Sequence, residues 1–210
     1  MVVEHLCGRD VRDQRVLEAM ARVPRHRFVG DELASCAYDD NPLSIGYGQT
    51  ISQPYMVAKM TELARIREGS RTLEIGSGSG YQTAVLLELG AIVFGIEIAQ
   101  PLARIASDRL KLLGYHGYQI VCRDGYMGWP EEAPFDAIIM GASPERVPPP
   151  LLDQLTLGGR LVAPVGPIEN QRLYVLTREG KGIRREAFFP VRFVPMTGRS
   201  QSETCREEKS

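Results

Sequence analysis

Glycines and carboxylates stand at regular intervals in the middle of the chain, where they could hold a nucleotide-like ligand. Glu74 precedes the glycine-rich run GSGSG at residues 76–80, and Glu97 follows the first of these glycines by about 20 residues. Glycines let the backbone approach a ligand and expose N–H groups at the start of a helix. A carboxylate at Glu97 can accept hydrogen bonds from ribose hydroxyls. A further acid and glycine, Asp124 and Gly125, suit contact with the edge of an adenine ring.

Each of these features has a plainer explanation when it is taken alone. Glycine-rich turns between a strand and a helix also serve packing, Glu97 could be a solvated acid, and Asp124-Gly125 could be a simple turn. The three features, however, would follow three successive strands, and the carboxyl ends of parallel strands share one edge of a sheet. Together they predict a pocket for an adenosine-containing ligand.

The loop pattern favours one adenosine cofactor over another. Dinucleotide-binding loops usually read GxGxxG, whereas this loop reads GxGxG and has an acid before it. A carboxylate at Glu74 would repel a pyrophosphate but can hold the cationic amino-acid part of S-adenosylmethionine. The alternative is a nicotinamide-dependent oxidoreductase. Tyr55 and Lys59 form the YxxxK pair of short-chain dehydrogenases, but they precede the glycine loop, and we expect Lys59 on a solvated helix face.

Strands and helices alternate through the part of the chain that holds these residues. Before it, residues 10–34 predict two short helices broken at Pro24, followed by a polar loop over 35–52 and a helix from Pro54. The strands are predicted at 71–75, 91–97, 117–122, 135–142, 158–166, 171–179 and 185–195, with helices at 81–89, from Pro101 and at 150–157. Pro190 places an edge or a bulge in the last strand. This alternation predicts a doubly wound α/β fold around a mostly parallel seven-stranded sheet.

Composition restricts the function classes. The 210 residues fit one domain, and a net charge of −1 argues against a dedicated nucleic-acid binder. The four cysteines are scattered without a CxxC pair, so we expect reduced thiols and no metal site. No apolar run approaches the ~20 residues that a bilayer requires, and Glu4 makes the N-terminus a poor signal peptide. We therefore expect a cytoplasmic monomer that binds neither nucleic acid nor membrane.

Four longer stretches resemble a known family. They read SIGYGQTISQPYMVAKMTELARI, LEIGSGSGYQTAVL, RDGYMGWPEEAPFDAIIM and VRFVPM, and the likeness runs from about Val16 to Thr197. Together they resemble the protein-L-isoaspartate O-methyltransferases, which are class I S-adenosylmethionine-dependent methyltransferases. The resemblance implies methylation of the α-carboxylate of isoaspartyl residues in proteins and peptides, giving an ester that closes to a succinimide. It also implies the class I fold.

The same resemblance assigns roles to residues. It implies Ser52 as the active-site serine, in a segment that lines both the cofactor and the substrate. Residues 10–66 would form the N-terminal helices and active-site loop, 71–197 the cofactor-binding core, and 198–210 a disordered tail. The implied cofactor-binding residues are Thr50, Ile51, Ser52, Glu74, Gly76, Ser77, Gly78, Gly80, Glu97, Asp124, Gly125 and Thr197.

The implied chemistry needs no strong base. A carboxyl group with an unperturbed pKa of ~4 is already ionised at neutral pH. Orientation and water exclusion would supply most of the rate, and a neutral donor such as Ser52 could position the carboxylate without quenching it. Methyltransferases that attack planar amino nitrogens commonly carry Asn/Asp-Pro-Pro-aromatic after the fourth strand, where this chain has GASPERV. A binding module without activity remains the further alternative.

Overall fold

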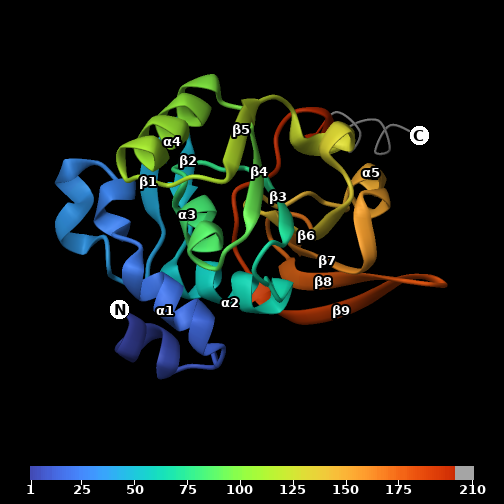
Figure 1. Cartoon of the computed structure of the whole chain (residues 1–210), viewed down its shortest axis with the longest axis horizontal. Helices are drawn as coiled ribbons and strands as arrows, with labels where there is room; N and C mark the ends of the chain where they lie inside the picture. The colour runs from blue at the N-terminus through green and yellow to red at the C-terminus, as the bar shows by residue number, and fades with distance from the viewer. Residues whose placement is uncertain (202–210) are drawn as a thin grey trace.

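The computed structural model describes residues 1–201 (Figure 1). It extends beyond residue 198, where the tail was expected to begin. Gly198 to Gln201 form a helical turn in which the Gln201 N–H donates to the carbonyl oxygen of Gly198. The rest of the expected tail, including Cys205, lies outside the described residues. Within residues 1–201, no helix has both the length and the apolar character needed to cross a bilayer.

A seven-stranded sheet forms the centre of the molecule, with the strand order β5-β4-β3-β6-β7-β8-β9. The first five strands in that order are parallel, and β8 and β9 are antiparallel to their neighbours. The prediction of a mostly parallel seven-stranded sheet is therefore confirmed. The strands are β3 (Arg71–Ile75), β4 (Ile92–Glu97), β5 (Tyr118–Cys122), β6 (Phe135–Met140), β7 (Leu155–Val165), β8 (Gln171–Glu179) and β9 (Gly182–Val191).

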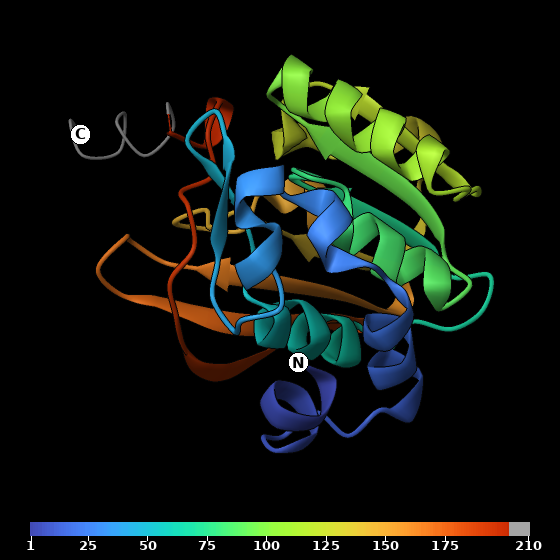
Figure 2. The ribbon, with the colours of Figure 1, turned by 90° about the vertical axis from the view of Figure 1, so that its left-hand side faces the viewer.

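Helices cover both faces of the sheet, which explains the unbroken apolar runs in its central strands. The helices α1 (Gln14–Arg22), α2 (Pro54–Ala64) and α3 (Tyr81–Glu88) pack around one hydrophobic core, with the N-terminal segment against α2 (Figure 2). Helix α4 (Gln100–Leu112) lies along β4 and β5. The other face buries Trp129 and Phe135 beneath α5 (Pro149–Asp153). Pro54 and Pro101 stand in the first turns of α2 and α4, as predicted.

Two predictions about the N-terminal part were wrong. The expected second helix is replaced by two 3-10 turns, Arg25–Phe28 and Asp31–Cys36. The expected loop over 35–52 contains an antiparallel hairpin of β1 (Leu43–Gly46) and β2 (Gln49–Ile51). The hairpin forms because its turn residues have positive φ angles, 83° at Gly46, 54° at Tyr47 and 70° at Gly48. In β9 the register shifts near Pro190 on the edge of the sheet, as its proline predicted.

Lys59 corrects a third expectation, because it is buried rather than solvated. Only 8% of the residue is exposed. Its Nζ lies 2.8 Å from Oε2 of Glu62 and 3.1 Å from Oδ2 of Asp10. The hydroxyl of Tyr55 donates to Oδ1 of the same aspartate at 2.6 Å. The YxxxK pair thus ties the N-terminal segment to α2.

Candidate active site

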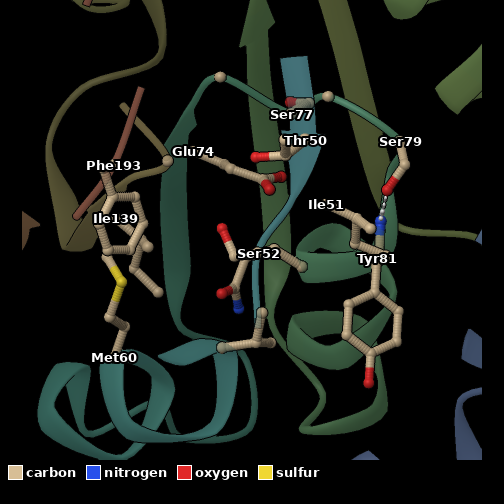
Figure 3. A pocket seen from close by; sticks show the side chains of 15 residues that line it. Thr50, Ile51, Ser52, Met60, Glu74, Ser77, Ser79, Tyr81, Ile139 and Phe193 are labelled. Atoms are coloured by element: carbon tan, nitrogen blue, oxygen red, sulfur yellow. Dashed lines mark hydrogen bonds between the residues drawn. The ribbon is translucent and has the colours of Figure 1, made fainter. Parts of the chain in front are cut away.

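Three adjoining cavities lie at the carboxyl ends of the central strands, beneath the hairpin β1–β2. The inner cavity contains Glu74 and Ser77 and is shown in Figure 3. The distal cavity contains Glu97, Gly125 and Thr197. The outer cavity, of about 720 Å³, opens beside Ser52. Thr50 and Gly141 border all three, so the cavities form one continuous site.

Glu74 is a buried carboxylate that lacks a cationic partner. It is the penultimate residue of β3, with 1% of its surface exposed, and Thr83 Oγ1 donates to its Oε2 at 2.5 Å. Burial, with a smaller contribution from the nearby Glu97 carboxylate, raises the pKa of Glu74 to about 7. No lysine or arginine of the described chain forms an ion pair with it. A positively charged ligand in the inner cavity would supply the missing charge.

The glycine loop lines the same cavity as the Glu74 carboxylate and has a backbone conformation that favours glycine. Gly76 and Gly78 have φ angles of 85° and 52°, which a side chain would strain. Ser77 Oγ is buried beside the Glu74 carboxylate and opposes the rise that burial causes in the pKa of Glu74, but no hydrogen bond of normal geometry joins it to residues 1–201. A buried hydroxyl without a partner is uncommon and suggests a ligand group. Gly80 has a different role, because an added Cβ would lie 3.3 Å from that of Ala106 in α4, and it does not line the cavities.

Glu97 lies at the end of β4, where the sequence analysis placed it. It is 4% exposed. The backbone N–H of Gly78 donates to its Oε2 at 2.9 Å, and that of Ala99 donates to its Oε1 at 2.9 Å. Each carboxylate oxygen can accept a second hydrogen bond. The residue can therefore hold the loop and still accept from a pair of ribose hydroxyls in the distal cavity.

Asp124, which the sequence analysis placed at the adenine edge, accepts hydrogen bonds from two backbone N–H groups. Its Oδ1 accepts from the backbone N–H of Tyr126 at 2.9 Å, and its Oδ2 accepts from that of Arg199 at 2.7 Å. The side chain thus fastens the end of the described chain to the turn after β5. Gly125 and Thr197 line the distal cavity instead, and Asp124 does not.

The segment Thr50, Ile51 and Ser52 ends the hairpin above the inner cavity (Figure 3). Ile51 is buried, whereas Ser52 is half-buried and borders both the inner and the outer cavities. The Ser52 hydroxyl forms no hydrogen bond with residues 1–201, so it can donate to a ligand in either cavity. This arrangement places the hydroxyl-bearing residues Thr50 and Ser52 at the border between a buried anionic pocket and an open one.

The family model for protein-L-isoaspartate(D-aspartate) O-methyltransferase matches residues 1–201. The chain belongs to this family. It is 54% identical to the protein-L-isoaspartate O-methyltransferase of Gloeobacter violaceus, over 97% of this chain and 100% of that one. It is also 54% identical to that of Opitutus terrae, over 94% and 85% of the two chains. As a member of this family, the chain is an S-adenosylmethionine-dependent methyltransferase of isoaspartyl residues.

Two solved structures support the same family. One protein-L-isoaspartate O-methyltransferase superposes with a TM-score of 0.90 at 27% identity, covering 100% of this chain and 70% of the other. A putative family member from Plasmodium falciparum, in complex with S-adenosyl-L-homocysteine, superposes with a TM-score of 0.81 at 30% identity, covering 93% and 96%. The fold predicted from the sequence is that of the isoaspartate methyltransferases.

Some residues of the site were given no role by the sequence analysis. Phe193 borders the inner and outer cavities because the chain after β9 returns across the strand ends. The Ser143 N–H donates to Val194 O, and the Met196 N–H donates to Ser143 O, each at 2.8 Å. These contacts fix the returning segment, which contains most of the family motif VRFVPM (residues 191–196). Gln82 and Gly141 also line the site and were not predicted.

Proposed function

We propose that this site transfers the methyl group of S-adenosylmethionine to the α-carboxylate of an L-isoaspartyl residue and that Ser52 orients that carboxylate. The methyl ester then closes to a succinimide. The observation that carries the proposal is the position of Ser52, between a buried anionic cavity and an open one. A small cationic donor suits the first cavity, and a peptide suits the second.

The cofactor supplies, when bound, a methyl group activated by a sulfonium. Glu74 and Ser77 would hold its cationic amino-acid end, because the carboxylate lacks a counter-charge and the hydroxyl lacks a partner. Glu97 would accept from the ribose hydroxyls while its bond to Gly78 keeps the loop in place. Gly125 and Thr197 would enclose the adenine end. The residues present fit the cofactor at each part of the site.

Ser52 would act by positioning and not by removing a proton. The substrate carboxylate is ionised near neutral pH, with an ordinary pKa of ~4, so it needs no base. A cationic partner would lower its nucleophilicity, whereas a hydroxyl donor fixes one oxygen and leaves its charge largely intact. Thr50, on the same hairpin, would confine the other side of the substrate group. The buried Ile51 and the partly buried Phe193 would exclude water.

The proposal extends to the context in which the enzyme works. We propose a single methyltransferase domain that acts as a cytoplasmic monomer on isoaspartyl-containing proteins and peptides and does not bind nucleic acid. Support comes from the net charge of −1 and from the scattered cysteines. Gel filtration of the full chain would test the oligomeric state.

Methyl transfer to a peptide pair tests the proposed reaction directly. The two peptides have the same sequence and differ only in whether one residue is L-isoaspartyl or L-aspartyl. We expect labelled methyl from S-adenosylmethionine to appear as a base-labile ester on the isoaspartyl peptide alone. Equal labelling of both peptides, or label that resists base, would contradict the proposal. Tighter binding of NADH than of S-adenosylmethionine would favour the oxidoreductase alternative.

A further inference from the structure

The outer cavity carries charge of one sign. Among the described residues that line it, the charged ones are Arg9 and Arg192, and none is an aspartate or a glutamate. The chain as a whole has a net charge of −1, so this cavity departs from a nearly neutral protein. A cleft lined by one sign of charge raises the local concentration of ligands of the opposite sign.

Arg9 is fixed against the wall of the cavity. Its Nη1 lies 3.0 Å from Oδ2 of Asp40, and its guanidinium carbon lies 3.5 Å from the centroid of the Tyr55 ring. Asp40 also accepts from Gln53 Nε2 and from the backbone N–H of Tyr55, so both of its oxygens are in use. The ion pair offsets part of the Arg9 charge and keeps the guanidinium in one place.

Arg192 has the opposite character, because its charge is not offset. The residue is exposed, and its side chain forms no hydrogen bond or ion pair with residues 1–201. The backbone beside it is nevertheless fixed, since the Phe193 N–H donates to Gln171 Oε1 at 2.6 Å and Gln171 Nε2 donates to Phe193 O at 3.1 Å. An unpaired guanidinium therefore extends from a fixed point at the cavity rim, with all five of its donors available.

We propose that Arg192, with a smaller contribution from Arg9, selects substrates that carry a carboxylate near the isoaspartyl residue. This inference rests on the proposed function, because it treats the outer cavity as the site for the peptide. The carboxylate would belong to an aspartate or glutamate next to the isoaspartyl residue in the sequence. Apolar walls formed by Met56 and Phe189 would contact the rest of the peptide.

The size of the effect follows from the exposure of the charge. An exposed ion pair contributes little, so we expect a preference of about 3- to 5-fold in kcat/KM for one acidic neighbour over a neutral one. Screening by salt should reduce this preference, because Arg192 lies at the rim and not in a dry interior. The effect should appear in KM, since Arg192 contacts the peptide and not the reacting atoms.

Two sets of three isoaspartyl peptides would test the selection. Within a set the peptides differ at one neighbouring residue, which is glutamate, glutamine or lysine; this residue lies on the amino side of the isoaspartate in one set and on the carboxyl side in the other. The full chain should methylate them with kcat/KM in the order glutamate, glutamine, lysine on at least one side. Arg192→Glu should reverse that order through KM, and Arg9→Gln should weaken it less. About 300 mM salt should compress the differences seen at about 20 mM.

Arg104→Glu is the matched control. The substitution changes the charge by the same amount as Arg192→Glu, but on the exposed face of α4 and outside the outer cavity. It should keep the order of the unmodified chain. Equal kcat/KM for the three peptides, or the same order in Arg192→Glu as in the unmodified chain, would overturn the selection and leave the proposed function intact. Failure of the unmodified chain to methylate any of the peptides would overturn the proposed function and the selection with it.

Discussion

The backbone N–H of Gly78 donates a hydrogen bond of 2.9 Å to Oε2 of Glu97. This bond joins the glycine loop after β3 to the last residue of β4, and both belong to the wall of the distal cavity. One carboxylate therefore shapes the loop and presents its remaining acceptor positions to the ligand. A change in Glu97 should therefore also alter the conformation of the glycine loop, and a change in the loop should alter the position of Glu97.

Glu97→Ala should weaken binding of S-adenosylmethionine by about 1.5–3 kcal/mol, the range for a charge-assisted acceptor. The variant loses the ribose acceptor and also the bonds from Gly78 and Ala99. Glu97→Gln is the matched variant and should lose less, because its amide oxygen still accepts. Isothermal titration calorimetry on folded protein measures both. An unchanged dissociation constant for the alanine variant would remove the ribose assignment.

Gly78 and Gly80 should respond differently to substitution although they stand two residues apart. Gly78→Val places a branched side chain at φ 52°, with its Cβ 3.3 Å from Ile45 Cδ1 at the cavity wall, so cofactor binding should be lost. Gly80→Ala instead presses on Ala106 of α4 and should lower thermal stability more than affinity. Calorimetric binding and thermal unfolding of both variants separate the two roles. Normal binding by Gly78→Val would show that the loop serves packing alone.

Glu74 should make the stability of the cofactor-free protein fall as pH rises. Its pKa is about 7 in the folded chain and near 4.5 when unfolded, so between these values the folded state holds more protons. Stability from this group is therefore full below about pH 4.5 and is lost as pH rises to about 7, by about 3 kcal/mol in all. Glu74→Gln should remove this slope. Urea unfolding across this pH window would reveal it, and an equal slope in both proteins would contradict the assignment.

Cofactor affinity should change with pH in the opposite direction. The ionised Glu74 attracts the cationic end of the cofactor, so affinity should rise roughly 10- to 30-fold between about pH 5.5 and 8.5 and level off above the pKa. Glu74→Gln should bind more weakly at the higher pH and show little dependence. Titrations at several pH values, in one ionic strength, measure this. A flat profile for the unmodified chain would mean that the carboxylate does not face the cationic end.

Ser52→Ala should slow methyl transfer roughly 10- to 1000-fold, or about 1.4–4 kcal/mol, as expected for one lost donor in a preorganised site. Cofactor affinity should fall much less, because Glu97 and the glycine loop remain. With saturating cofactor, the pH profile above about pH 6 should keep its shape, since the substrate carboxylate is ionised with or without the hydroxyl. Single-turnover rates of both proteins are the measurement. A new ionisation near neutrality in the variant, or an unchanged rate, would exclude this role.

The sequence was informative where one strand and the turn after it decide the position of a residue. Glu74 is the penultimate residue of one short apolar strand and Glu97 is the last residue of the next, so their places at one edge of the sheet followed from the alternation of elements alone. The pairing of β1 with β2 was not predicted, because strands of four and three residues give too little periodicity. The 3-10 turns after Pro24 were missed for the same reason.

Contacts between distant segments account for the remaining differences. Asp124 bonds to the backbone of Arg199, and no local pattern connects these two positions. The burial of Lys59 depends on Asp10, which lies in a separate N-terminal segment. The role of Gly80 depends on the approach of α4. In each case the sequence analysis named the residue, but the partner that decides its role lies in another part of the tertiary fold.

The Asp124-Gly125 pair also bears on how this enzyme ages. Isoaspartate forms when the backbone nitrogen after an aspartate attacks the side-chain carbonyl carbon, and glycine leaves that nitrogen least shielded. The chain thus carries, next to a residue that lines its own cofactor cavity, a dipeptide that is prone to the damage it repairs. In the fold, N–H groups of Tyr126 and Arg199 hold both oxygens of that carboxylate and resist the rotation that ring closure requires. Long-lived enzyme should therefore accumulate isoaspartate at residue 124 faster when the turn at 198–201 is loosened.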